Sequence, residues 1–370
     1  MKDKVKKYFS IPESRRVIYD YIRVLACIGI ICLHATGDRS DLVGIFFETT
    51  SRIALPMFVL LSGVLVLGNP KTEDYLKFYG RRIVKIVIPY LIYGIIYIGW
   101  VYEGNNIPGS ITWDRIHRLV TQIPRAIVVS MEEPPYFHLW FMMMIMGFYI
   151  VAPFYQRGLQ GLKDKDLKWL YIVMLAVYTM SDYVPLIGIK IGINGFFPNW
   201  SIYFIAGYIL YRFDNKRAHR FFAIIGAVSV VFMFLWKMRH PDIVIANFYD
   251  LAPHMLLATC GVFSMAMLLE PYITKLKWLN WIFMKISNYT FSIYMIHGFI
   301  LISYVNSHES AAQTVKGTIT EVLFVFFKCL IFVVIFDNLI TFNIQRLIYF
   351  VTDKVSKLVK RLPFAKRQES

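Results

Sequence analysis

Charged side chains are scarce in this sequence, and acidic ones are scarcer than basic ones. Of its 370 residues only 17% are charged, whereas 57% are apolar, and the mean hydropathy is +0.52. Soluble domains carry about 25% charged residues, so this composition excludes a soluble enzyme and predicts a polytopic membrane protein. The 40 Lys and Arg against 24 Asp and Glu give a formal net charge of +16. Basic residues in alternate cytoplasmic loops explain this excess better than nucleic-acid binding does.

Cysteine is also rare, and it lacks the spacing of a disulfide or metal framework. The four cysteines all lie within apolar runs, and none belongs to a CxxC pair. Neither a disulfide framework nor a zinc site is therefore indicated, and we expect no metal. We interpret the four thiols as small buried apolar groups; they are Cys27, Cys32, Cys260 and Cys329.

Long apolar runs, in contrast, are abundant. A membrane-spanning helix needs about 20 apolar residues, and the sequence predicts an all-α bundle of about ten such helices. The first follows the basic segment 1–16 without a small-residue cleavage site, so we expect a retained span rather than a signal peptide. We assign 1–345 to the membrane domain, 346–370 to a basic cytoplasmic tail, and about 103–137 to an external cap loop. The predicted spans are residues 18–37, 43–68, 83–102, 138–155, 169–187, 199–213, 221–236, 248–269, 286–305 and 321–345.

The distribution of Lys and Arg predicts the orientation of these spans. With the N-terminus in the cytoplasm, the internal segments carry 29 basic residues and the external loops carry 8, and three more lie within spans. This asymmetry favours a cytoplasmic location for both termini and an even number of spans. The predicted internal segments are residues 1–17, 69–85, 156–169, 211–220, 270–286 and 346–370.

The first span contains an arginine and a histidine, Arg23 and His34, where lipid would otherwise surround the chain. An intramembrane Arg costs at least about 2.5–3.5 kcal/mol on the insertion scale. Eleven α-helical residues turn through about 1100°, roughly 20° from three full turns, and rise roughly 16 Å. Both side chains therefore share one helix face, which favours a polar path through the bundle. The alternative is a snorkelling Arg23 and a polar helix end at His34.

Two further segments carry basic residues at or within predicted spans. Arg52 precedes Pro56 in the second span, and a proline-kinked helix with an arginine is more typical of a cavity wall than of a lipid-facing surface. Arg81, Arg82 and Lys85 enter the third span from the cytoplasm. They are either an ordinary positive-inside flank or an anion site, since Arg82 and Lys85 share a helix face.

Aromatic residues and histidines mark two later spans as candidate acceptor contacts. His138 and Trp140 open the fourth predicted span at an interface, where an aromatic belt is also normal. Tyr294 and His297 lie three apart within the ninth, where a histidine is more typical of a cavity than of a lipid-facing surface. We expect structural roles at span ends for Asp182, Asp250, His254, Glu270 and Asp337.

Five motifs in order resemble the integral-membrane acyltransferase-3 family, bacterial enzymes that modify cell-surface sugars. They are "RVLACIGIICLH", "SRIALPMFVLLSG", "RRIVKIVIPY", "FHLWFMMMIMGFYIVAPF" and "YTFSIYMIHGFI". The resemblance covers roughly residues 15–345. One departure is Lys85, which stands where the family usually has a second arginine, so charge is kept but a bidentate fork is lost.

The resemblance implies transfer of an acyl group, usually acetyl, from cytoplasmic acetyl-coenzyme A to a hydroxyl outside the cell or on a lipid-linked sugar. His34 is then the general base or a transient acyl carrier, and Arg23 orients the donor or stabilises the developing oxyanion. Arg82, Lys85, Arg81 and Arg52 would bind the coenzyme. His138, Trp140, Tyr294 and His297 would contact the acceptor. The implied location is the bacterial cytoplasmic membrane.

Two other classes of protein fit parts of the pattern. A secondary transporter of an oligosaccharide or organic anion would also carry intramembrane charges and a broken helix, but the sequence shows no inverted repeat. A membrane sensor or assembly partner that keeps the fold without catalysis is disfavoured because Arg23 and His34 are both present. The acceptor glycan, the acyl group and the oligomeric state stay open.

Overall fold

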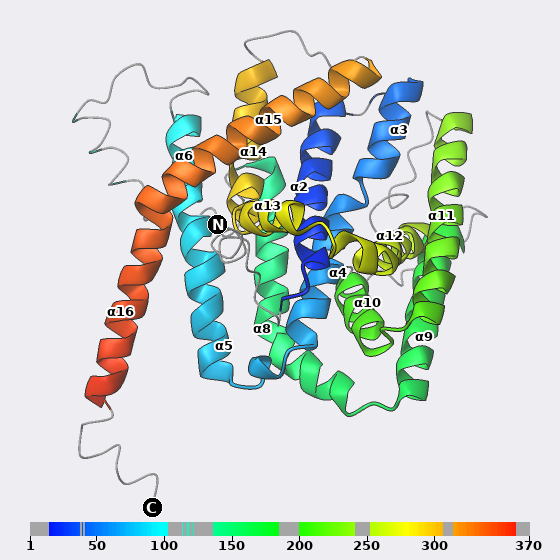
Figure 1. Cartoon of the computed structure of the whole chain (residues 1–370), viewed down its shortest axis with the longest axis horizontal. Coiled ribbons are helices and arrows are strands. Elements are labelled where there is room, and N and C mark those ends of the chain that lie inside the picture. The colour runs from blue at the N-terminus through cyan, green and yellow to red at the C-terminus, as the bar shows by residue number, and fades with distance from the viewer. Residues whose placement is uncertain are drawn as a thin grey trace, which may run out of the picture. The chain divides into compact units, whose positions relative to one another are not determined.

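The computed structural model consists of helices and their connections (Figure 1). It describes residues 15–37, 39, 41–102, 136–184, 200–240, 252–305 and 314–359, with single positions at 113, 117 and 121. Every regular element within this part of the chain is helical, which confirms the predicted all-α class. Most of the predicted cap loop, the end of the tail, Asp250 and the side chain of Asp182 lie outside the described residues.

Six helical stretches are long and apolar enough to cross a membrane, which confirms a polytopic membrane protein. Each of the other four predicted spans also coincides with a helix, but one that is shorter or less apolar, so the count of ten stays a prediction. The six stretches are Ile18–Thr36, Leu42–Leu67, Phe137–Gln160, Lys216–Arg239, Pro253–Ile273 and Val315–Thr352.

The chain divides into two compact units. The first comprises residues 1–73 and 151–328, and the second comprises residues 74–150 and 329–370. Helix α2 (Ile18–Thr36) packs against five other helices of the first unit and is drawn in dark blue in Figure 1. The helices of this unit besides α2 are α3 (Leu42–Ser51), α4 (Ala54–Leu67), α9 (Asp164–Tyr183), α10 (Ser201–Arg212), α11 (Lys216–Arg239), α12 (Pro253–Ile273), α13 (Lys277–Ser287) and α14 (Thr290–Val305).

The second predicted span is broken where an arginine and a proline were expected to kink it. Helix α3 ends at Ser51, and α4 begins at Ala54, so Arg52 and Ile53 lie at the break. Pro56 has no N–H to donate to the carbonyl of Arg52, four residues earlier, and this removes one helical hydrogen bond at the junction. The regular helix is thus interrupted near the predicted position, and Arg52 lies at the end of a short helix.

Glycine accounts for the close crossing of α4 and α10. A Cβ atom on Gly63 would lie 1.9 Å from the carbonyl oxygen of Phe204, and one on Gly207 would lie 2.0 Å from that of Leu60. Only glycine therefore fits at either position. This contact explains the Ser-Gly pair of the second span by helix packing.

The second unit contains two π-helical turns. One, Ile83–Val87, joins α5 (Tyr75–Arg82) to α6 (Ile88–Tyr102), and the other, Asp337–Thr341, joins α15 (Val315–Phe336) to α16 (Phe342–Val359). Helices α8 (Trp140–Gln160) and α15 each contribute residues to both units. The side chain of Gln345 donates to the carbonyl of Val84 at 3.0 Å, which satisfies a backbone group of the first π turn.

Two sequence predictions need correction in this unit. Asp337 is not at a span end: it is 0% exposed within a continuous helical stretch and accepts a 2.8 Å hydrogen bond from Tyr93. A buried tyrosine hydroxyl makes an interior position possible for this carboxyl group. Lys85 lies within the π turn, where hydrogen bonds run from i to i+5. The α-helical spacing that placed it on one face with Arg82 therefore does not apply.

Candidate functional site

Two histidines from different helices meet within the first unit. The rings of His34 on α2 and His297 on α14 are stacked, with centroids 5.3 Å apart and an angle of 23° between their planes. His297 is 0% exposed, and its Nδ1 lies 2.6 Å from the carbonyl oxygen of Tyr294. A carbonyl only accepts, so Nδ1 carries a proton and Nε2 holds the lone pair of the neutral ring. The structure thus joins three residues that the sequence singled out.

An ion pair lies at the C-terminal end of α3, a helix that packs against α2, which carries His34. Arg52 donates from Nη2 to Glu48 Oε1 at 3.0 Å and from Nε at 3.2 Å. Glu48 is only 4% exposed, and sequence reasoning missed it. The pairing of Glu48 and Arg52 four residues apart on α3 was the available signal. We call His34, His297, Glu48 and Arg52 the histidine centre.

A cavity of about 440 Å³ opens at the other end of α2. Arg23 lines it, as do two arginines that precede the helix, Arg15 and Arg16. A volume of this size is within the range of small-molecule and cofactor sites, about 300–1,000 Å³. We call it the arginine cavity. Its remaining lining residues are Tyr19, Asp20, Val64, Leu65, Gly68, Asn69, Pro70 and Tyr211.

Asp20 holds two of these arginines in place. Its carboxylate is 2% exposed and accepts hydrogen bonds from Arg15 Nε at 2.8 Å, Arg15 Nη2 at 2.6 Å and Ser287 Oγ at 2.6 Å. Arg23 Nη1 lies 3.7 Å from the same carboxylate. A buried carboxylate needs such partners to offset the loss of water. Sequence reasoning missed Asp20, although its position three residues before Arg23 was a signal.

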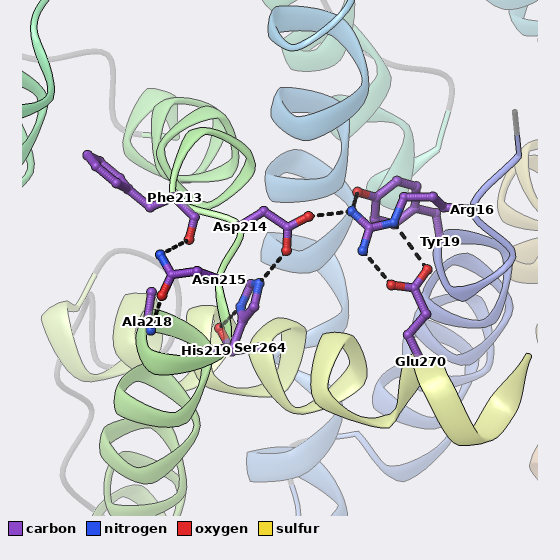
Figure 2. A network of polar contacts seen from close by, with 9 residues as sticks. All are labelled: Arg16, Tyr19, Phe213, Asp214, Asn215, Ala218, His219, Ser264 and Glu270. Atoms are coloured by element: carbon purple, nitrogen blue, oxygen red, sulfur yellow. Dashed lines mark hydrogen bonds and ion pairs between the residues drawn. The ribbon is translucent and has the colours of Figure 1, made fainter.

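Arg16 belongs to a separate network (Figure 2). It forms an ion pair with Glu270, with Nε 3.1 Å from Oε1, and its Nη1 lies 2.6 Å from Asp214 Oδ2. It also donates to the Tyr19 hydroxyl at 3.3 Å. Figure 2 shows Glu270 and Asp214 on opposite sides of the Arg16 side chain. Glu270 thus has the structural role that the sequence predicted, as an anchor for the start of the chain.

Asp214 continues this network into a buried chain of polar groups. It accepts from His219 Nε2 at 2.9 Å, and Ser264 Oγ lies 3.2 Å from His219 Nδ1. A Ser-His-Asp order resembles a hydrolase triad, but in such triads Nε2 faces the serine. Ser264 is also 0% exposed, so a substrate carbonyl has no access to its oxygen. These residues therefore support Arg16 rather than perform chemistry.

The three arginines of the cavity differ in the carboxylates that they face. Arg16 faces two carboxylates, whereas Arg15 and Arg23 share the single carboxylate of Asp20. Where two guanidinium groups share one carboxylate, they can also form hydrogen bonds to a phosphate group.

The cavity and its network join segments that the Lys and Arg count placed on one side of the membrane. Arg16, Asn69, Tyr211 and Glu270 come from four different predicted internal segments. The charge count does not use tertiary contacts, so this agreement is independent support for a cytoplasmic cavity. His34 lies near the opposite end of the same helix.

The other predicted site residues lie in the second unit. Arg82 lies over the rings of Tyr149 and Phe78, at 4.5 and 5.1 Å from their centroids. His138 is 2% exposed and has three aromatic neighbours within 5.6 Å, whereas Trp140 is 39% exposed. The roles proposed for these residues, and for Arg81 and Lys85, stay predictions. The neighbours of His138 are Tyr97, Tyr136 and Phe137.

Asp214 gives the network a predictable response to acid. Burial acts to raise the pKa of Asp214, but hydrogen bonds from His219 and Arg16 outweigh it and hold this pKa below its ordinary value. A depressed carboxyl pKa stabilises the fold above the unfolded-state pKa of about 3.9, and this contribution is lost as the pH falls through the folded pKa. Asp214→Asn is therefore expected to lower the melting temperature at pH 7. This deficit should shrink below about pH 4.

Thermal unfolding of the purified protein in detergent across this pH range measures the effect. Glu73→Gln is the matched control, because Glu73 is an exposed carboxylate without an ion pair among the described residues. A deficit in Asp214→Asn that stays constant down to pH 3 would contradict the assignment.

Comparison with known families identifies the chain. The family model described as an acyltransferase domain, that of the acyltransferase 3 family, matches residues 16–337. No curated protein and no solved structure matches the chain. The matched region includes the whole histidine centre and every lining residue of the arginine cavity except Arg15. With most of its length matched, this chain belongs to the acyltransferase 3 family of multi-pass membrane acyltransferases.

Proposed function

We propose that this protein transfers an acetyl group from cytoplasmic acetyl-coenzyme A to a hydroxyl of an extracytoplasmic or lipid-linked glycan in the bacterial cytoplasmic membrane. The observation that carries this proposal is the arrangement along α2. The helix has the arginine cavity at one end and the histidine centre near the other. The charged phosphates of the acyl donor would occupy the arginine cavity, and its neutral thioester would lie at the histidine centre.

The donor enters at the arginine cavity with its phosphates. Arg23 and Arg15 supply guanidinium groups beside Asp20 on one side of this cavity. Arg23 and His34 are separated by roughly 16 Å along the helix axis. The pantetheine arm of coenzyme A is an extended chain that can bridge a separation of this order. Arg81, Arg82 and Lys85 are proposed as a second group of phosphate contacts.

The histidine centre performs the transfer. An imidazole of His34 takes the proton of the acceptor hydroxyl, whose oxygen bonds to the thioester carbonyl carbon. The carbon–sulfur bond then breaks, and the departing thiolate of coenzyme A takes the proton back from the imidazolium. We assign to Arg52 the stabilisation of the oxyanion that forms in between. In the alternative relay, the imidazole attacks the thioester first and then passes the acetyl group to the hydroxyl.

Mass spectrometry of the surface polysaccharides tests this function and identifies the acceptor. Cells that lack the gene are expected to lose an acetyl increment from one polymer, and complementation should restore it. The rival reading, a transporter, is favoured by the broken α3–α4 span with Arg52 at its break. Counterflow of labelled sugar in proteoliposomes without any acyl-coenzyme A would support that rival and contradict acyl transfer.

A further inference from the structure

Helix α13 (Lys277–Ser287) is too short to cross a membrane. Its 11 residues extend over roughly 16 Å, whereas the hydrocarbon core of a bilayer is about 30 Å thick. It begins four residues after the end of α12, which is one of the six stretches able to cross a membrane. The Lys and Arg count assigns this junction to the cytoplasmic side. We therefore expect α13 at the level of the lipid headgroups on that side.

The inward face of α13 holds the start of α2. Asn280 and Ser287 are 2% and 5% exposed. Asn280 Oδ1 accepts a hydrogen bond from the Tyr21 hydroxyl at 2.9 Å, and Phe283 stacks on the Tyr21 ring with centroids 3.8 Å apart. Ser287 donates to Asp20 at 2.6 Å. These contacts fix the orientation of α13, and they determine which of its side chains face away from the protein.

The outward face of α13 carries large apolar and aromatic side chains. Trp278 is 60% exposed, and just before the helix Leu276 and Tyr272 are 45% and 67% exposed. Lys285 follows Trp278 by seven residues, which turn through about 700°, so the two side chains share a helix face. The Nζ of Lys285 also lies 5.7 Å from the ring centroid of Trp281. Trp and Tyr are favoured at the interface of a membrane with water, so this face has the composition of an interfacial helix.

Three exposed lysines accompany these aromatic rings: Lys275, Lys277 and Lys285. The Nζ of Lys275 lies 5.6 Å from the ring centroid of Tyr272. In the described part of the chain, no carboxylate lies within 4.0 Å of any of the three ammonium groups. We call them the α13 lysines. Their positive charge beside exposed apolar surface is complementary to a bilayer of anionic lipids.

We propose that the α13 lysines bind the phosphates of anionic phospholipids at the cytoplasmic face of the membrane, while Trp278 and Leu276 enter the lipid interface. The position of α13 directly after a membrane-spanning stretch favours a bilayer over a soluble acidic partner. Because the opposite face of α13 binds Asp20 through Ser287, the bound lipid also stabilises the start of α2. This lipid site is independent of acyl transfer.

Titration of the purified protein in neutral detergent with phosphatidylglycerol that carries brominated acyl chains tests the proposal. Bromine quenches the fluorescence of a tryptophan that it contacts, and the part of the quenching lost in Trp278→Phe reports on α13. The combined variant Lys275→Gln, Lys277→Gln and Lys285→Gln is expected to weaken this binding about tenfold or more, because each lysine near anionic headgroups contributes several-fold. Phosphatidylglycerol should also raise the melting temperature of the wild type more than that of this variant.

A matched control removes the same charge from another predicted cytoplasmic segment. Lys163, Lys165 and Lys168 are exposed, but Asp164 and Asp166 alternate with them and reduce the local positive charge. The combined variant Lys163→Gln, Lys165→Gln and Lys168→Gln should therefore bind phosphatidylglycerol at α13 as the wild type does.

Three results would overturn the inference. The first is equal affinity for phosphatidylglycerol in the wild type and in the variant that lacks the α13 lysines. The second is an equal loss of affinity in the control variant, which would reduce the effect to the net charge of the protein. The third is equal quenching of Trp278 by brominated phosphatidylcholine, which would make this surface a general lipid contact without selection of anions.

Discussion

His34→Ala is expected to abolish acetyl transfer while the protein still inserts into the membrane. General acid–base catalysis contributes about 10²–10⁴-fold, and the loss is larger if His34 carries the acetyl group itself. Insertion should be unaffected, because the change removes a polar side chain near the end of α2 from a mainly apolar helix. Transfer of radiolabelled acetyl from acetyl-coenzyme A in isolated membranes, normalised to the amount of protein, measures the effect.

Substitution of His297, whose ring is stacked on that of His34, should reduce acetyl transfer less than substitution of His34 does. His297→Gln removes the second imidazole but keeps an amide that can hydrogen-bond, so a fall of about 10²-fold is expected. His240→Ala is the matched control, because His240 follows the end of α11 and its ring contacts Trp236, with centroids 4.8 Å apart, rather than the histidine centre. Near-normal transfer by His34→Ala would remove His34 from the reaction.

Arg23→Ala is expected to raise the KM for acetyl-coenzyme A by about 10–100-fold. A hydrogen bond to a charged group is worth about 1.5–3 kcal/mol, and Arg23 lines the arginine cavity beside Asp20, a carboxylate that it shares with Arg15. Arg23→Lys should give an intermediate KM, since it keeps the charge but loses the planar fork. Initial rates at varied acetyl-coenzyme A concentration in membranes give both constants.

Arg16→Ala tests whether Arg16 and Arg23 have different roles in the arginine cavity. Arg16 faces both Asp214 and Glu270, so its removal leaves two carboxylates without this cation and should lower the melting temperature more than Arg23→Ala does. Its effect on the KM for acetyl-coenzyme A should be smaller. Equal effects of the two substitutions on KM would contradict the assignment of the phosphate contacts to Arg23.

Sequence reasoning found the two histidines of the histidine centre because ionisable residues inside apolar runs stand out against their surroundings. Arg23, His34 and His297 were chosen on that ground, and the structure stacks the two histidines 5.3 Å apart. Asp20 and Glu48 were missed, although each forms a local ion pair on its own helix. Carboxylates near span ends were interpreted as flanks, because burial depends on neighbouring helices that a local pattern does not reveal.

The polar network around Arg16 shows a different limit. The charge count placed its segments on the same side of the membrane, but it had no means of pairing Arg16 with Asp214 and Glu270, which are 198 and 254 residues away in the chain.

Lys85 shows a third limit of sequence reasoning. A π turn changes the angular step between residues, and periodicity arguments assume a regular α-helix.

Acetyl transfer across sealed inside-out membrane vesicles tests the central claim most directly. Radiolabelled acetyl-coenzyme A is supplied to the cytoplasmic face, which is outside these vesicles, and the glycan acceptor is enclosed in the lumen. Acyl transfer predicts an acetyl ester on the enclosed glycan and free coenzyme A outside, with neither product formed by His34→Ala. Unmodified glycan leaving the lumen in the absence of acetyl-coenzyme A, with no ester formed when the donor is present, would contradict it.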